Sequence, residues 1–218
     1  MISVADLLID NRLPSNYFVS DVYVRGTLEF GLLENRRGDR LLALPDALMK
    51  SIVAGLNQET GQATKYVLRN CGLWWGKNFY ARFCEELSEY YQQGVAELPM
   101  IEFVKALQEC WRTHGWGVLT INTDYQTKGF LMIEIENSPF TQHVIQRGQP
   151  SGALESGILQ AFFSQLTGRD LTCVQISCES LGADCNRFVL GLENRLQAAE
   201  ALAEEGQPHT AIMQMLIQ

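Results

Sequence analysis

Apolar and polar residues recur along this chain with two different periods. A spacing of three to four predicts amphipathic helices, and it covers residues 3–10, 45–57, 63–92, 99–114, 139–146, 153–166, 193–205 and 209–217. A period of two, rich in β-branched and aromatic residues, predicts strands, and these lie within 17–44 and at 116–122, 129–136, 171–178 and 186–190. This pattern predicts an α+β fold, with an antiparallel sheet of about four or more strands and helices on one side.

The composition changes after Gly191 to Ala, Glu, Leu and Gln. We therefore expect a domain over residues 1–191 and a C-terminal helical hairpin appendage over 192–218. Two roles for the hairpin stay open, either a docking appendage or a helix pair that covers the sheet or a dimer seam. The second is favoured, because apolar helix faces usually pack in cores.

Charge excludes some partners and favours others. The formal net charge is −8, which argues against binding to nucleic acid or to an anionic membrane surface. A small basic cluster of Arg36, Arg37 and Arg40 lies in a Gly-Asp turn and is expected to be a solvated hairpin tip. Because no apolar run reaches the ~20 residues needed to cross a bilayer, we expect a soluble, cytoplasmic protein.

Six cysteines at wide, irregular spacing, with no signal peptide ahead of them, predict thiols in a reducing compartment rather than disulfides. Half of them, Cys173, Cys178 and Cys185, surround a turn at Gly182 between two apolar runs. Such a hairpin is typical of a metal, redox or ligand site. Buried cysteines that act as small hydrophobic residues are the favoured alternative, since the spacing matches no zinc motif.

Strand geometry limits how these thiols can meet. Cys173 and Cys178 are an odd number of positions apart, so on a regular strand they point to opposite faces. Pairing Ile176 with Phe188 makes one sheet face uniformly apolar and is the favoured register. The alternative register brings Cys178 opposite Cys185 but sets Ile176 against an arginine. A shared site therefore requires a bulge or a wide loop.

The segment 63–92 is apolar on more than one side, so it must be buried on several faces or against a second subunit. Gly72 and Gly76 lie four residues apart on one of its faces, beside several aromatic residues. They would let a flat apolar molecule approach the backbone closely. Close helix packing is the alternative, and it is favoured because aromatic stripes usually belong to a core.

Motifs for nucleotide and protease chemistry are absent from the sequence. There is no Gly-x-Gly-x-x-Gly, no phosphate-binding loop and no His-Glu-x-x-His, so these reactions lack their usual parts. Among the few histidines, His114 follows a predicted helix end and His143 lies in a short helix. A structural role is favoured for both.

Several local patterns resemble the V4R (4-vinyl reductase) family. They are Gly115-Trp116-Gly117, Glu136-Asn137-Ser138-Pro139, a helix containing Gly157, Thr167-Gly168-Arg169 and, most specifically, the sequence from Cys178 to Phe188. The resemblance covers about residues 45–191. A closer resemblance is to cyanobacterial V4R proteins associated with photosystem assembly.

The resemblance implies the NO-signalling/Golgi-transport ligand-binding fold. Vesicle-tethering subunits that hold a lipid chain, phenol-sensing domains and proteins linked to bacteriochlorophyll synthesis share it. It holds a small hydrophobic molecule between helices and sheet, often in a homodimer. The ligand-binding residues that we expect here are Gly72, Trp74, Trp75, Gly76, Phe79, Phe83, Phe103 and Leu107.

The resemblance also bears on zinc. In the aromatic-sensing members, zinc is bound by cysteines and a glutamate. Cys178 and Cys185 match two ligand positions, and Cys173 or Glu179 are possible additions. Gln175 stands where the glutamate is expected, and no cysteine lies between residues 111 and 172 to supply an upstream ligand.

The leading hypothesis is therefore a non-catalytic module that binds a tetrapyrrole, a chlorophyll precursor, a bilin or a lipid in support of photosystem or pigment-protein assembly. Its partners would be a second copy and photosystem assembly proteins, and one of these could hold it at the thylakoid membrane. One alternative is a tetrapyrrole vinyl reductase with Cys178 or Cys185 as proton donor. Another is a protein-only scaffold that works through the acidic surface and residues 193–218.

Overall fold

The computed structural model describes residues 16–142 and 148–218, and their packing separates into two compact units. The first unit holds the described residues up to Leu44 together with Cys84–Gly115, and the second holds Pro45–Phe83 and Trp116–Gln218. These units do not coincide with the expected division at residue 191. The predicted helix at 3–10 and the end of that at 139–146 lie outside the described residues, and 139–142 form turns rather than helix.

The first unit combines a small sheet with helices. Three short strands pair antiparallel in the order β1-β2-β3, and Leu33 of the middle strand faces Gly26 and Leu41. The elements are α2 (Ser20–Tyr23), β1 (Arg25–Thr27), η1 (Leu28–Phe30), β2 (Leu32–Glu34), β3 (Arg40–Leu41), η3 (Val95–Glu97) and α5 (Met100–Thr113). Helix α5 buries its apolar face, which includes Phe103, Leu107 and Trp111. This is the amphipathic helix that the spacing predicted.

The basic turn of the first unit is exposed at Arg37, Gly38 and Arg40, as its sequence suggested, but two of its arginines have side-chain partners. The Arg36 guanidinium lies over the rings of Tyr17 and Tyr90, 4.9 Å from each ring centroid. Arg37 forms ion pairs with Glu85 at 3.3 Å and Glu89 at 3.2 Å. Cation–π contact and ion pairs therefore hold this turn against helix α4 (Thr64–Tyr91).

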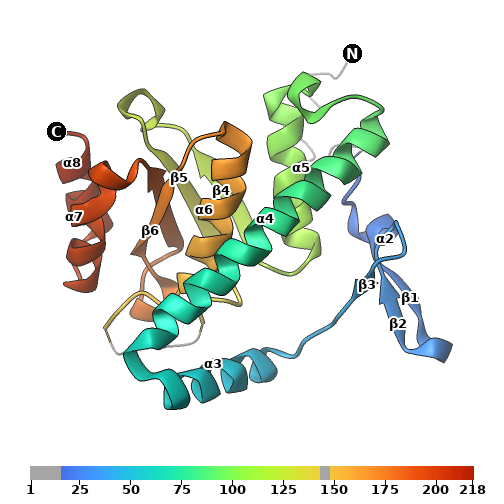
Figure 1. Cartoon of the computed structure of the whole chain (residues 1–218), viewed down its shortest axis with the longest axis horizontal. Helices are drawn as coiled ribbons and strands as arrows, with labels where there is room; N and C mark the ends of the chain where they lie inside the picture. The colour runs from blue at the N-terminus through green and yellow to red at the C-terminus, as the bar shows by residue number, and fades with distance from the viewer. Residues whose placement is uncertain (1–15, 143–147) are drawn as a thin grey trace. The chain divides into compact units, whose positions relative to one another are not determined.

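The second unit is built on a four-stranded antiparallel sheet in the order β4-β5-β7-β6. Figure 1 shows the sheet with α6 and α4 on one side and α7 and α8 on the other. The elements are α3 (Asp46–Thr60), η2 (Gly61–Ala63), the first part of α4, β4 (Val118–Asn122), η4 (Gln126–Lys128), β5 (Leu131–Glu136), α6 (Ala153–Thr167), β6 (Thr172–Ser177), η5 (Glu179–Leu181), β7 (Asn186–Gly191), α7 (Glu193–Glu204) and α8 (His209–Leu216).

Both faces of this sheet are covered, which corrects the expectation of helices on one side. Val174 and Val189 form a core cluster with residues of α7 and α8, among them Leu196 and Ile212. The C-terminal hairpin thus covers the sheet. The reason lies in strands β6 and β7, whose residues are apolar on both faces, so that each face needs a partner.

The pairing of β6 with β7 also differs from the favoured register. Val174 faces Val189 and Gln175 faces Phe188, while Ser177 faces Arg187. A bulge at Ile176 separates these two registers. The bulge keeps the buried Ile176 from standing opposite the arginine, which is the conflict that argued against this register.

Helices α4 and α6 pack against each other through glycines. A methyl group built on Gly72 would lie 2.1 Å from the backbone oxygen of Leu154, and one on Gly157 would lie 2.2 Å from that of Arg69. One on Gly76 would lie 2.6 Å from the backbone oxygen of Ile158. The backbones therefore approach more closely than any larger residue permits. Helix packing, the alternative noted for Gly72 and Gly76, describes these positions.

We predict that Gly72→Ala lowers the free energy of unfolding by about 1–3 kcal/mol, because the added methyl group forces the two helices apart. Gly55→Ala is the matched control, since Gly55 lies in α3 with nothing within 4 Å of the added methyl group. That substitution should raise stability by up to ~1 kcal/mol through helix propensity. Urea unfolding followed by circular dichroism measures both. Equal stability of Gly72→Ala and the native chain would contradict the packing described.

Candidate ligand-binding site

A small cavity lies in the second unit among helices α3, α4 and α6, partly open to solvent. Its volume is about 30 Å³, and its walls are apolar apart from one hydroxyl group. The lining residues are Met49, Ile52, Val53, Leu68, Phe140, Ser151 and Leu154. A water molecule needs ~10–15 Å³ by this measure, so the cavity has room for roughly two.

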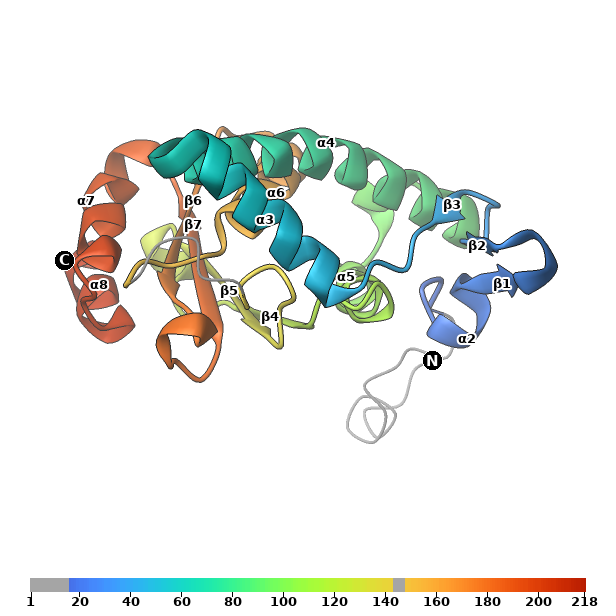
Figure 2. The same cartoon turned by 90° about the horizontal axis from the view of Figure 1, so that it is seen from below.

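Helix α3 forms the loosely packed wall of this cavity. Of its described residues, Val53 alone is buried, whereas Leu48 and Ile52 are exposed. Few buried apolar contacts mean that little free energy opposes displacement of this helix. Figure 2 shows α3 lying alongside the first part of α4.

Ser151 supplies the hydroxyl group and connects the cavity with the cysteine hairpin. Its Oγ donates to the backbone oxygen of Thr141 at 2.7 Å. The same oxygen lies 3.4 Å from Cys178 Sγ and 3.2 Å from Ser180 Oγ. Because a hydroxyl has one proton, its remaining contacts make it an acceptor from these neighbours.

Three of the aromatic residues expected to bind a ligand, Trp75, Phe79 and Phe83, form a cluster that reaches the cavity through Trp116. Trp75 and Phe79 stack at a centroid distance of 5.2 Å with an angle of 4°, and Trp116 meets both edge-on. Trp116 also lies 6.3 Å from Phe140, which lines the cavity. Phe83 is buried, near Phe79.

The remaining expected residues lie elsewhere. Trp74 is 77% exposed, and Phe103 and Leu107 are buried in the first unit. Those lining the cavity were missed by sequence reasoning, although Ser151 carried a signal as a polar residue at the entry to an apolar helix. The prediction that the eight residues bind a ligand stays a prediction.

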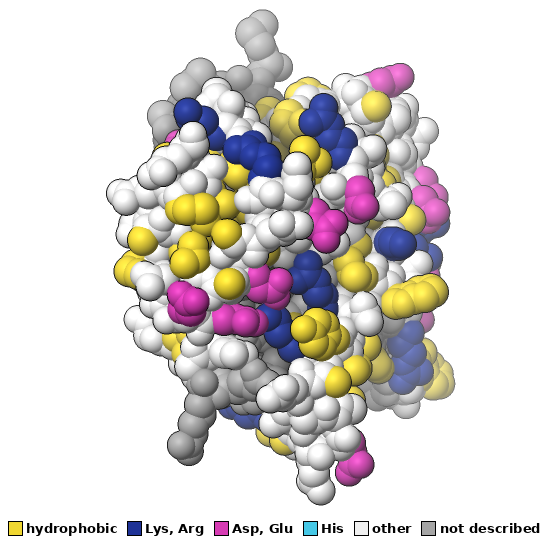
Figure 3. Space-filling model, turned by 60° about the vertical axis from the view of Figure 1, so that its left-hand side comes forward, with side chains coloured by type: hydrophobic (Ala, Val, Ile, Leu, Met, Phe, Trp, Pro, Cys, Tyr) yellow, Lys and Arg dark blue, Asp and Glu magenta, His cyan; other side chains and the backbone are white. Residues whose placement is uncertain are grey.

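A larger open groove of about 420 Å³ runs between α4, β6 and α7, and several of the side chains that line it are charged. Lys65 Nζ lies there 2.8 Å from a carboxylate oxygen of Glu200 and also contacts Glu204. Figure 3 brings the side of α7 and α8 forward and shows acidic and basic side chains intermixed across it. This surface therefore offers neither a continuous apolar patch nor a field of one sign.

Comparison with known proteins identifies the region that carries the cysteine hairpin. The family model described as V4R domain matches residues 131–192, a stretch that begins with β5 and ends after β7. The match covers less than a third of the chain. The resemblance noted in the sequence from Cys178 to Phe188 is thereby confirmed, and no curated protein sequence matches the chain.

Solved structures share the fold of the chain. The phenol-responsive sensory domain of the transcription activator PoxR, solved with phenol, has a TM-score of 0.64 at 12% identity, covering 90% of this chain and 99% of that domain. A trafficking protein particle complex subunit 3 from Naegleria fowleri, covalently bound to palmitic acid, has a TM-score of 0.52 at 11% identity, covering 68% of this chain and 92% of that subunit. A vinyl-4-reductase family protein from Methanocaldococcus jannaschii has a TM-score of 0.45 at 15% identity, with coverages of 69% and 82%. The first two structures confirm the expected α+β fold. None of the helices in the described ranges has the length and hydropathy to span a membrane.

The cysteines of the V4R region are buried thiols. Burial raises the pKa of Cys173 to about 12 and that of Cys185 to about 11. Cys178 is buried as well. Within residues 16–142 and 148–218, no group of three or more His, Cys, Asp and Glu side chains is arranged to hold a metal ion.

The V4R region also contains a buried carboxyl group, Glu155, in the first turn of α6. Its Oε2 accepts a hydrogen bond from Ser138 Oγ at 2.9 Å, and its Oε1 has no hydrogen-bond partner among the described residues. Its pKa is raised to about 8, chiefly by burial, with smaller increases from Glu179 and Cys178 and a lowering effect of the Ser138 hydrogen bond. Glu155 is therefore mostly protonated at neutral pH.

We predict that the stability of this protein falls as pH rises from about 5 to 8. A carboxyl group whose pKa is higher in the folded state than in the unfolded state binds its proton more tightly when the protein is folded. Its contribution to the free energy of unfolding is therefore full below the pKa of the unfolded state and is lost as the pH rises through the pKa of the folded state. Glu155→Gln keeps the shape and cannot ionise. Its melting temperature should exceed that of the native chain by a margin that grows toward pH 8.

Thermal unfolding at pH 5, 6, 7 and 8 measures this margin. Glu205→Gln serves as the control. Its side chain is exposed, so no burial of a charged group is relieved when the carboxyl group is replaced by an amide. A margin for Glu155→Gln that is constant across the pH range would contradict the assignment.

Proposed function

We propose that this protein binds a small hydrophobic molecule in the cavity among α3, α4 and α6. The observation that carries the proposal is a mostly apolar cavity with a single hydroxyl group, that of Ser151, at its wall. Apolar walls supply affinity, and one placed polar group orients the ligand. The V4R match and the fold shared with a phenol-bound sensory domain and a palmitate-bound subunit support this proposal.

The ligand would enlarge the cavity by displacing α3. The present volume, about 30 Å³, is far smaller than a typical ligand pocket of ~300–1,000 Å³. The exposed positions Leu48 and Ile52 show how weakly this helix is held. Outward movement would open the cavity between Val53 on one side and Leu68 and Leu154 on the other.

The finer part of the proposal concerns ligand and context. A planar tetrapyrrole, a chlorophyll precursor, a bilin or a lipid chain would occupy the opened space, in support of photosystem or pigment-protein assembly. The cluster of Trp75, Phe79 and Trp116 supports a planar ligand, because it presents aromatic rings next to Phe140 at the cavity wall.

The two alternative functions draw less support. A proton donor whose pKa is about 11, as for Cys185, is poorly matched to catalysis near neutral pH. The hairpin of α7 and α8 packs its apolar residues on the sheet, so it does not stand free as a docking arm.

Titration of the purified protein with phenol, palmitic acid and protoporphyrin IX, each in a separate series, tests ligand binding through tryptophan fluorescence. We expect a saturable change with at least one of the three. Val53→Phe fills the cavity and should weaken that binding at least tenfold. Ala54→Phe, on the exposed side of the same helix, should leave it unchanged.

The proposal fails if none of the three series saturates. It also fails if Val53→Phe and Ala54→Phe bind equally well while both keep the native melting temperature.

We further propose that two copies associate. The exposed aromatic side chains of Tyr66 and Trp74 on α4 support this, since large apolar groups on a surface favour association. Light scattering at micromolar concentration should give the mass of two chains, and Trp74→Ser should shift it toward one. Lys77→Ser, on the same helix, is the control. A single-chain mass for the native protein would rule association out.

A further inference from the structure

The loop between β6 and β7, residues 178–185, carries two of the cysteines, and side-chain hydrogen bonds hold it to the sheet. Asn186 is the centre of one set of these hydrogen bonds. Its Nδ2 donates to Glu179 Oε2 at 2.6 Å and to the backbone oxygen of Ile135 at 3.1 Å. Its Oδ1 accepts from the backbone N–H of Glu179 at 3.0 Å. One fully buried amide thus joins the start of the loop to β5 and β7.

Gln175 and Glu179 extend this network in both directions. Gln175 Nε2 donates to Asn186 Oδ1 at 3.2 Å, and its Oε1 accepts from the backbone N–H of Gly152 at 2.7 Å. The second oxygen of Glu179 accepts from the backbone N–H of Asn137 at 2.9 Å. The network therefore ties the loop to the entry of α6 and to the end of β5.

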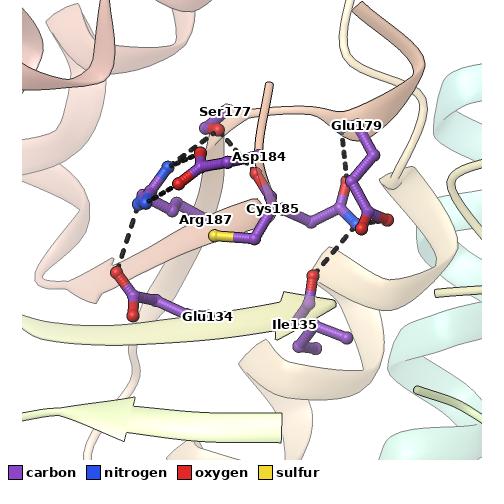
Figure 4. A network of polar contacts seen from close by, with 8 residues as sticks. Glu134, Ile135, Ser177, Glu179, Asp184, Cys185 and Arg187 are labelled. Atoms are coloured by element: carbon purple, nitrogen blue, oxygen red, sulfur yellow. Dashed lines mark hydrogen bonds and ion pairs between the residues drawn. The ribbon is translucent and has the colours of Figure 1, made fainter. Parts of the chain in front are cut away.

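Arg187 makes a second set of hydrogen bonds that hold the loop. It donates two hydrogen bonds to the carboxylate of Asp184, at 2.7 and 3.0 Å, and one to Glu134 at 3.1 Å. Successive residues of a strand point to opposite faces, so Asn186 and Arg187 hold the loop from the two sides of β7. Figure 4 shows Arg187 directed toward Asp184 and Glu134 and away from Glu179.

These contacts leave little for a zinc ion to bind. The position expected to carry a glutamate holds Gln175, a neutral amide whose oxygen and nitrogen both have partners. Both oxygens of Glu179 are engaged. Cys178 Sγ lies against the hydroxyl groups of Ser151 and Ser180. Zinc sites use thiolates, imidazoles and carboxylates in closed sets of four, and the donors that the described residues place at this loop do not fit one.

We propose that the hydrogen-bond network centred on Asn186 takes the place of a structural zinc ion in this chain and holds the cysteine hairpin closed without metal. The inference is independent of ligand binding in the cavity, because none of Gln175, Glu179 and Asn186 lines it. A metal-held loop and a network-held loop differ in a measurable way, since a chelator removes the first constraint and leaves the second.

Elemental analysis of the full chain, purified without a chelator and with any affinity tag removed, is the first test. We expect less than 0.1 zinc per chain, as an order of magnitude for a protein without a structural site. The melting temperature should be unchanged by EDTA and by added zinc chloride. One zinc per chain, together with a lower melting temperature in EDTA, would overturn the proposal.

Substitution of the network is the second test. Asn186→Ala removes one partner each from the buried amide of Gln175 and the half-buried carboxylate of Glu179, and it should lower the melting temperature by about 5–10 °C. It should also speed hydrogen exchange at the loop amides of Leu181, Gly182 and Ala183, which are bonded to loop carbonyl oxygens. Asn194→Ala, at an exposed position of α7, is the matched control and should change neither quantity.

A third variant covers the case in which Asn186→Ala does not fold. Gln175→Met keeps the length of the side chain and removes the amide, so it weakens the network at its edge. Faster exchange at the same loop amides would support the proposal. Exchange and melting temperature equal to those of Asn194→Ala, in either network variant, would falsify it.

Discussion

The second unit depends on the close approach of helices α4 and α6. Gly72 and Gly157 face each other without side chains, so the backbones meet where other residues would hold them apart. The same two helices contribute Leu68 and Leu154 to the cavity. The distance between the helices thus sets the width of that space, and the cavity follows from the glycines as much as from its own lining residues.

The sheet shows how polar groups can be buried at low cost. Each amide and carboxylate of the Asn186 network has a partner, so desolvation is largely offset by hydrogen bonds. Glu155 differs, because one of its oxygens lacks a partner in the described structure and the group adapts by keeping its proton. The Asn186 network, in which each buried polar group has a partner, and Glu155, which keeps its proton, therefore respond differently to pH.

The sequence predicted the helices well because their periodicity is long and regular, as in the segment that became α4. It also identified the V4R hairpin from its motif. The register of β6 could not be predicted, since apolar residues on both faces made two pairings look similar and the bulge at Ile176 combined them. For the same reason the sequence did not predict that helices cover both faces of the sheet. The cavity was missed because it depends on how three helices cross, which no local pattern encodes.

Connectivity gives the loose packing of α3 a wider meaning. Strand β3 of the first unit ends at Leu41, and α3 begins at Asp46, so a short tether separates the wall of the cavity from the small sheet. Its four residues, 42–45, reach at most ~3.6 Å each. Any displacement of α3 therefore has to be accommodated by the backbone of these residues, and Pro45, directly ahead of the helix, fixes one of the dihedral angles that could otherwise change.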